Sequence, residues 1–347
     1  MAETINHKLK KSFFTESGYE IKNPEIAYRS WGNLNSLNDN VILICHALTG
    51  NTDANDWFGG LIGKGKSIDP EKHFILCPNI VGSCYGSTGP TSINPDTGKA
   101  YQADFPEITI RDIVRFNQLL LDDLDINGIE LVIGGSLGGM TALEFVIMDD
   151  RVQSAALLAM GKAHSPWAIG ISQAQRLAIY ADEHWNDGFY SPENPPAKGL
   201  AAARAMAMIT YRSPENYELK FGRDIHPQKQ LYQVESYLNY QGQKLVDRFD
   251  ANTYITLSHA MDTHDVSRNR GSFEEVLGNI HKPVLVVGFK SDKLYPINEQ
   301  KELAELIPNS TFASLDSPYG HDAFLIEFDQ LNTQLTSFFH SLTEVKS

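Results

Sequence analysis

The chain has 347 residues, of which 42% are hydrophobic and 21% charged, a composition typical of globular proteins and not of disordered or fibrous ones. Its 29 lysines and arginines against 43 aspartates and glutamates give a formal net charge of −14, which disfavours nucleic acid and anionic membranes as partners. No apolar run approaches the roughly 18 residues that span a bilayer, and the polar amino terminus does not resemble a secretory signal. Because three cysteines make no disulfide framework, we expect a cytoplasmic protein.

Short apolar runs separated by turn residues and helical patterns fill the first 160 residues. Residues 41–45, 74–77 and 131–133 have the composition of buried strands, and each run leads into a stretch rich in polar residues or glycine. Residues 110–124 carry apolar side chains near helical spacing, with Thr109 as the expected N-cap. This alternation predicts a mostly parallel sheet with helices on both faces, an α/β fold.

The pattern changes in the middle of the chain and then returns. Stretches rich in alanine, arginine, glutamine and aromatic residues, with helical periodicity, precede new strand patterns at 283–287 and 311–315 and a final helix from about 322 to 342. We therefore predict one α/β domain interrupted by a helical lid, rather than two consecutive domains. The predicted boundaries are 1–162 and 274–347 for the core and 163–273 for the lid.

Residues 134–138, Gly-Gly-Ser-Leu-Gly, match the G-x-S-x-G nucleophile elbow. A predicted strand precedes the motif and a helical pattern, residues 139–148, follows it, which is the context that the motif requires. The glycines allow a sharp turn that exposes Ser136. The alternative interpretation, an ordinary capping serine in a glycine-rich turn, fits this context less well.

A serine hydroxyl needs a neighbouring base, and the base needs an orienting acid. In folds with this elbow the partners follow in the order Ser, Asp or Glu, His, at the ends of later strands. Asp292 follows the strand pattern at 283–287 and His321 follows the one at 311–315, so both are expected at carboxyl ends of strands. The predicted insertion accounts for the long separation between Ser136 and Asp292.

Acyl transfer also needs donors aimed at the developing oxyanion. The backbone N–H of Leu137, directly after the nucleophile, is one predicted donor, and the N–H of Leu48 in the loop after residues 41–45 is the other. A plain turn at 46–50 is the alternative. His46, in the same loop, precedes the serine and so has the wrong order for the base.

Three further patterns are expected to carry no chemistry. Residues 60–67 match the P-loop pattern letter for letter but neither follow a strand nor open a helix. His259 and His264 lie five residues apart, which does not place both on one helical face for a metal. Cys84 has no partner in the order that thiol catalysis requires and is expected to pack in its loop.

Together these motifs resemble the homoserine O-acetyltransferase family of α/β-hydrolase-fold acyltransferases. The resemblance extends from about residue 12 to residue 330, and one substitution departs from it, since the family commonly has methionine where this chain has Leu137. The backbone N–H does the work at that position, so little consequence is expected. The matching stretches are 46–50, 79–90, 104–106, 109–112, 134–140, 199–213, 237–270 and 320–324.

The resemblance implies a ping-pong reaction in which Ser136 takes an acetyl group from acetyl-CoA and passes it to L-homoserine, giving O-acetyl-L-homoserine for methionine synthesis. It implies that Arg204 binds the substrate carboxylate, that Asp322 holds the ammonium group and that Tyr211 lines the pocket. It also implies a homodimer through the lid helices. Neither a metal nor an organic cofactor is called for.

Other functions remain open at the level of sequence. The same scaffold can accept succinyl-CoA as donor or serine as acceptor, and one methylene in the acceptor is worth only about 1–3 kcal/mol of discrimination. An esterase or thioesterase would use the same serine. A non-catalytic binding protein of this fold is the third class, against which the complete set of Ser136, Asp292 and His321 argues.

Overall fold

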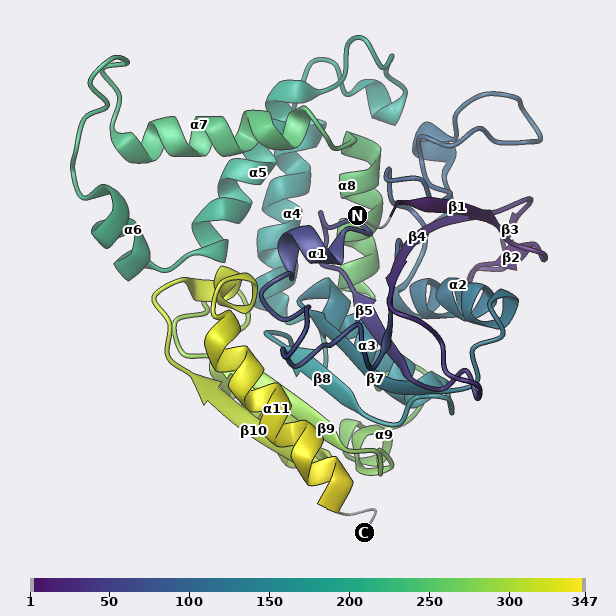
Figure 1. Ribbon diagram of the computed structural model, residues 1–347. Helices are drawn as coiled ribbons and strands as arrows, with labels where there is room; N and C mark the ends of the chain where they lie inside the picture. The colour runs from purple at the N-terminus through teal and green to yellow at the C-terminus, as the bar shows by residue number, and fades with distance from the viewer. Residues whose placement is uncertain (1–2, 345–347) are drawn as a thin grey trace.

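Eight strands form a single sheet in the order β1-β4-β6-β5-β7-β8-β9-β10 in the computed structural model, which describes residues 3–344 (Figure 1). The strands from β6 to β10 in this order pair in parallel, whereas β1 and β4 add an antiparallel edge. The predicted mostly parallel sheet is therefore confirmed. Its strands are β1 (Ile5–Lys8), β4 (Glu25–Trp31), β5 (Val41–Cys45), β6 (Phe74–Pro78), β7 (Ile129–Gly135), β8 (Ala155–Leu158), β9 (Val284–Phe289) and β10 (Ser310–Leu315).

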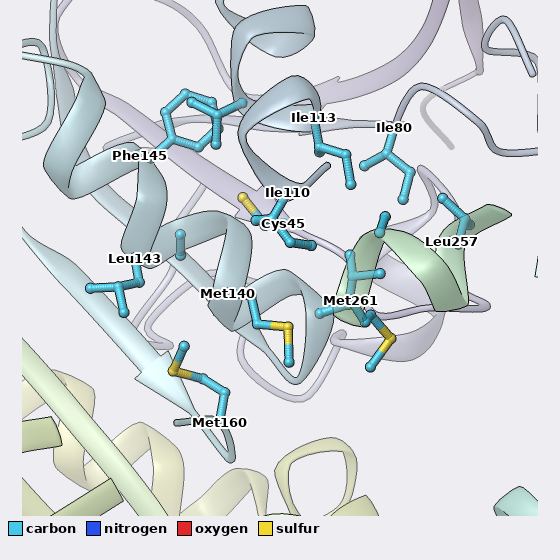
Figure 2. Close-up of a cluster of buried hydrophobic side chains, with 14 of the residues drawn as sticks. Cys45, Ile80, Ile110, Ile113, Met140, Leu143, Phe145, Met160, Leu257 and Met261 are labelled. Atoms are coloured by element: carbon cyan, nitrogen blue, oxygen red, sulfur yellow. The ribbon is translucent and has the colours of Figure 1, made fainter. Parts of the chain in front are cut away.

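The central strands are apolar throughout because both faces of the sheet are covered. Along β5 the side chains alternate between two hydrophobic clusters, with Leu43 and Cys45 on one face and Ile42 and Ile44 on the other. Helices α2 (Ile110–Asp123) and α3 (Leu137–Met148) cover the first face, where Figure 2 shows Cys45 among their side chains. Helix α11 (Phe328–Glu344) covers the second face. Thr109 caps α2 through the amide of Asp112, as predicted.

The segment between β8 and β9 is helical, and its helices α4 to α8 lie together above the sheet in Figure 1. This is the part of the chain for which the sequence predicts an inserted lid. Among the described residues no helix is long and apolar enough to cross a membrane. The helices after β8 are α4 (Pro166–Tyr180), α5 (Ala197–Tyr211), α6 (Pro214–Phe221), α7 (Gln233–Val246), α8 (Ala251–Asp262), α9 (Phe273–Gly278) and α10 (Ile297–Leu306).

Short elements complete the chain. They are strands β2 (Phe13–Phe14) and β3 (Glu20–Ile21), helix α1 (Ala54–Trp57) and the 3-10 turns η1 (Gln102–Asp104), η2 (Asn186–Gly188) and η3 (Gly320–Leu325). No helix follows the P-loop-like residues 60–67, because the backbone N–H and hydroxyl of Ser67 both donate to Asn332 on α11 and the chain then turns into β6. This confirms that the stretch lacks the strand-to-helix context of a phosphate loop.

The predicted final helix from 322 to 342 is wrong at its start. The chain forms the tight turn η3 first, leaves helical geometry at Ile326 (φ −131°, ψ −43°) and begins α11 only at Phe328. The physical reason is tertiary. Residues of η3 contact Gly135 on β7, Asp292 after β9 and Arg212 after α5. A 3-10 turn accommodates these contacts, whereas a continuous α-helix would rotate the side chains away.

Candidate active site

Ser136 occupies the sharp corner between β7 and α3. Its backbone (φ 57°, ψ −127°) lies in a region that non-glycine residues rarely adopt, and strain of this kind clusters at functional sites. The corner depends on close packing around it. A Cβ on Gly138 would lie 2.0 Å from the carbonyl oxygen of Cys45, and a Cβ on Gly134 would lie 2.3 Å from the oxygen of Gly138. Only glycine fits at these two positions, which explains the motif.

Asp292 and His321 form a buried hydrogen-bonded pair. His321 Nδ1 donates to Asp292 Oδ2 at 2.7 Å, and the two residues are 3% and 2% exposed. The other carboxylate oxygen accepts the backbone N–H groups of Leu294 (2.8 Å) and Tyr295 (3.0 Å). Because Asp292 accepts the hydrogen bond from Nδ1–H, the neutral imidazole has its lone pair at Nε2, the form that a general base needs.

Packing brings His321 to the serine corner. The ring of Phe324 lies where a Cβ on Gly135 would be, with its nearest atom 2.4 Å from that position, and its centroid is 5.5 Å from that of His321. Among the described residues no hydrogen bond joins Ser136 Oγ to the imidazole. Catalytic hydrogen bonds are often long without substrate and tighten in the complex, so the arrangement can still activate the hydroxyl.

The two predicted oxyanion donors are the backbone amides of Leu137 and Leu48. Leu137 is the first residue of α3, and Leu48 lies in the loop after β5, which packs against α3 through the close approach of Gly138 to Cys45. Within residues 3–344 neither amide has a hydrogen-bond acceptor. An unpaired backbone N–H group is able to donate to a negatively charged oxygen.

Arg204, Tyr211 and Asp322 gather beside the histidine. The guanidinium of Arg204 on α5 is 5.5 Å from the ring centroid of Tyr211, whose ring is 5.6 Å from that of His321. Arg204 is half-buried and has no carboxylate within 4 Å among the described residues. A cation in that situation is prepared for an anionic ligand.

Asp322 is already paired. Its Oδ2 lies 2.9 Å from Nε of Arg212, a residue that the sequence analysis did not single out. Burial raises the pKa of the Asp322 carboxyl, while the neighbouring Arg212 opposes that rise. The signal that could have found Arg212 is its place directly after Tyr211, at the end of α5.

Tyr295, a second residue missed by the sequence analysis, packs against the ring of His321. The phenol of Tyr295 bonds to Nδ1 of His164 at 2.9 Å, and its ring centroid lies 5.2 Å from that of His321. Burial is the main reason that the pKa of His164 falls to about 3, so this imidazole stays neutral at physiological pH. In the tautomer that carries its proton on Nε2, 3.3 Å from the hydroxyl of Ser172, Nδ1 accepts the phenolic hydrogen. Only the nearness of Tyr295 to Asp292 in sequence hinted at this role.

The remaining candidates take structural positions. His264 Nε2 bonds to the carbonyl of Gly161 at 2.9 Å, and His259 is exposed near Asp262. The described residues contain no cluster of three potential metal ligands. Cys84 is partly buried, and burial raises the pKa of its thiol to about 11, which makes it a poor nucleophile near neutral pH.

Sequence comparisons now bear on this site. The α/β-hydrolase fold family matches residues 40–328. The chain is 54% identical to the homoserine O-acetyltransferase of Chlorobium chlorochromatii, covering 98% of this chain and 96% of that protein. It is 52% identical to the homoserine O-acetyltransferase of Nostoc punctiforme, covering 95% and 94%. The chain belongs to the homoserine O-acetyltransferase family. This confirms both the resemblance and the fold inferred from the sequence.

Solved structures of this fold include both transferases and hydrolases. The homoserine O-acetyltransferase of Bacillus anthracis is 28% identical with a TM-score of 0.87, and the alignment covers 97% of each chain. Esterase E22 is 26% identical with a TM-score of 0.89, covering 97% of this chain and all of that one. Overall shape therefore does not separate transfer from hydrolysis, and the side chains of the site must do so.

The neutral His164 predicts a specific pH dependence of stability. Its pKa is about 3 when folded against an ordinary value of 6.5, so the unfolded chain binds the extra proton between these values and stability falls as the pH drops below 6.5. From pH 6.5 to pH 5 the contribution amounts to about 2 kcal/mol. We expect the difference in unfolding free energy between the wild type and H164Q, measured by urea denaturation, to shrink by this amount. H281Q, on the surface, is the matched control, and a difference independent of pH would contradict the assignment.

Proposed function

We propose that the protein is a homoserine O-acetyltransferase, which carries an acetyl group from acetyl-CoA to the hydroxyl of L-homoserine through an acyl-enzyme on Ser136. The product is O-acetyl-L-homoserine, an intermediate of methionine biosynthesis. The observation that carries the proposal is the buried Asp292–His321 pair beside the strained serine, in a chain 54% identical over nearly its full length to a homoserine O-acetyltransferase.

Acylation would begin with transfer of the Ser136 proton to Nε2 of His321. The serine oxygen attacks the thioester carbonyl, and the resulting oxyanion is held by the amides of Leu48 and Leu137. Collapse of the intermediate breaks the C–S bond, and the imidazolium returns its proton to the leaving sulfur. Asp292 stabilises the imidazolium and fixes its tautomer. The chemistry needs no prosthetic group, since acetyl-CoA enters as a co-substrate.

Deacylation would use the same groups in reverse. His321 removes the proton from the hydroxyl of homoserine and the resulting alkoxide attacks the acetyl carbonyl. The bond from that carbon to Oγ of Ser136 then breaks, and the imidazolium returns the proton to the serine oxygen. Arg204 would bind the carboxylate of the amino acid, and Asp322 would bind its ammonium group. The carboxylate of Asp322 would then be shared by this ammonium group and Arg212. Tyr211 lies between Arg204 and His321 and so lines the path from one to the other.

Transfer prevails over hydrolysis only when the amino alcohol is bound and oriented at the acyl-enzyme. The guanidinium of Arg204, which has no carboxylate within 4 Å in the described part of the chain, and the carboxylate of Asp322 favour an acceptor with both an anionic and a cationic group, which water lacks. This contrast favours a transferase over the esterase alternative. Acetyl over succinyl, and homoserine over serine, are the choices that the relatives' names support.

Replacing Ser136 tests the acyl-enzyme. S136A is expected to fold normally and to release no thiol from acetyl-CoA above the uncatalysed rate, because alanine has no hydroxyl to attack the thioester. Mass spectrometry of the wild type mixed with acetyl-CoA alone should show one acetyl group on the peptide containing Ser136, and homoserine should remove it. A chain whose acetyl group is lost to water at the same rate with and without homoserine would be an esterase.

Replacing Arg204 tests acceptor recognition. R204M is expected to lower kcat/KM for homoserine by about 100-fold, mainly through KM, because a charged hydrogen-bonding partner of the carboxylate is lost. The rate of acetylation by acetyl-CoA, followed as the thiol burst, should stay within about twofold. 3-Amino-1-propanol keeps the hydroxyl and the ammonium group of homoserine but has no carboxylate, so the two enzymes should acetylate it at similar rates. Equal losses in both half-reactions would contradict a role limited to the acceptor.

We further propose a homodimer formed through the helical segment. Large apolar side chains on α4 to α7 are exposed, among them Ile209 (56%), Leu219 (73%) and Tyr240 (60%). A second copy of the chain would cover such a surface. Sedimentation velocity should find twice the chain mass, and I209E with L219E should halve it. A wild type that sediments as a monomer at micromolar concentration would end this proposal.

We also propose a cytoplasmic location, which the thiols support, since Cys45, Cys77 and Cys84 are all free. Fractionation of the native cells, with activity found in the soluble fraction, tests it.

A further inference from the structure

We propose that Arg248 is a positioning residue for the reaction: from the junction of α7 and α8 it ties the helical segment to the loop that carries the Leu48 amide. The inference rests on the proposed function, because it assigns Arg248 a part in holding one donor of the oxyanion site. Arg248 itself touches no reacting atom in this arrangement.

Arg248 closes a ring of hydrogen bonds around that loop. Its Nη1 donates to the carbonyl oxygen of Thr49 at 2.9 Å and also to the hydroxyl of Tyr85. The carbonyl of Tyr85 accepts from Nδ2 of Asn79 at 3.0 Å, and Oδ1 of Asn79 lies 2.9 Å from Nε2 of His46. We call these five residues, His46, Thr49, Asn79, Tyr85 and Arg248, the bracing ring.

The bracing ring holds the loop on both sides of Leu48. His46 precedes Leu48 by two residues and Thr49 follows it directly, so both flanking segments are anchored by side chains from elsewhere in the chain. The side chain of Leu48 is buried in the core on the α3 side of the sheet. With its own side chain and its two neighbours fixed, the Leu48 amide has little freedom to turn away, which is the preorganisation that an oxyanion site requires.

The ring is also fixed to the sheet. The backbone N–H of Asn79 donates to Ala27 on β4 at 2.7 Å, and Asn79 is completely buried. Arg248 is the one member that comes from the helical segment, and it is exposed. The adjacent Phe249 packs edge-on against Tyr85 at 5.6 Å. Arg248 therefore makes the geometry of the loop depend on the seating of the helical segment above the sheet.

Arginine suits this position for a chemical reason. Its planar fork presents several N–H groups at fixed angles, so one side chain can reach a backbone carbonyl and a phenol at once, which the single ammonium of lysine does less well. No carboxylate lies within 4 Å of Arg248 among residues 3–344, so both bonds are made by a full positive charge to neutral acceptors.

Direct contact with the phosphates of the donor is the competing role. Arg248 and Tyr85 both line a cavity of about 440 Å³ between the loop after β6 and the junction of α7 and α8. An arginine that contacts phosphate would lower the affinity for acetyl-CoA when replaced, without changing the reaction of a donor that has no phosphate. A positioning residue would slow acylation by both donors. The two roles therefore predict different acylation rates with a small ester that has no phosphate: an unchanged rate for a phosphate contact and a reduced rate for a positioning residue.

The experiment compares acylation rates with acetyl-CoA and with p-nitrophenyl acetate in the wild type, R248M, R248K and Y85F. R248M is expected to lower the acylation rate constant at saturating acetyl-CoA by about 10- to 100-fold, below the roughly 10²- to 10³-fold loss that follows removal of an oxyanion donor. The same fall should be seen with p-nitrophenyl acetate. R248K should lie between the wild type and R248M, and Y85F, which removes one acceptor, should lose less than R248M.

K244M is the matched control. Lys244 lies on the last turn of α7, is exposed and makes no ion pair or side-chain hydrogen bond among the described residues, so K244M removes the same charge from the same region and should leave both rates unchanged. Thermal unfolding midpoints show whether each variant folds. If R248M does not fold, Y85F tests the same ring of hydrogen bonds.

The outcomes separate this inference from the proposed function. If R248M raises only KM for acetyl-CoA and reacts normally with p-nitrophenyl acetate, Arg248 contacts the donor and the positioning role is overturned. If R248M and Y85F both acylate like the wild type with both donors, the bracing ring has no catalytic part although the proposed function stands. If the wild type itself forms no acyl-enzyme with acetyl-CoA, the proposed function fails first.

Discussion

The site depends on one close approach, that of the first turn of α3 to the carboxyl end of β5. With hydrogen in place of a side chain, Gly138 lies against the carbonyl of Cys45, and any larger residue would force the helix away. This contact sets the strained corner at Ser136 and places the loop after β5 beside the helix start. The proposed nucleophile and the proposed oxyanion donors thus share a single packing constraint.

Burial then decides how each charged group behaves. The Asp292 carboxylate is removed from water but accepts three hydrogen bonds, so it remains a suitable partner for an imidazolium. Asp322 is paired with Arg212. Within residues 3–344 the half-buried guanidinium of Arg204 has no carboxylate within 4 Å, and the carboxylate of an amino acid substrate would neutralise this charge. The charged side chains around His321 therefore indicate the kind of acceptor more specifically than the fold does.

An esterase and an acetyltransferase resemble this chain with almost equal TM-scores, so the backbone does not distinguish acyl transfer from hydrolysis. A serine, a histidine and two amides suffice for either reaction, because an acyl-enzyme reacts with whichever hydroxyl is presented to it. The two reactions differ in which acceptor, water or an amino alcohol, occupies the space beside His321. In this chain that space is bounded by α5 and η3, elements separated by more than a hundred residues in sequence.

Local sequence alone was enough to determine the buried strands at 41–45 and 74–77, the elbow at 134–138 and the cap at Thr109, because each is a short pattern whose physical cause lies within a few residues. Asp292 and His321 were predicted as partners of Ser136 from their order at the ends of later strands, and the hydrogen bond between them appears only in the fold. The roles of Arg204, Asp322 and Tyr211 came from family resemblance, and the structure places these residues together. Only the tertiary structure decided the turn at 320–325, the pairing of Arg212, the support of His321 by Tyr295 and the bond from Arg248 to Thr49. The last of these joins residues 199 positions apart. No pattern in a chain records such contacts, since they arise where packing brings distant segments together and a buried polar group must find its partner across that distance.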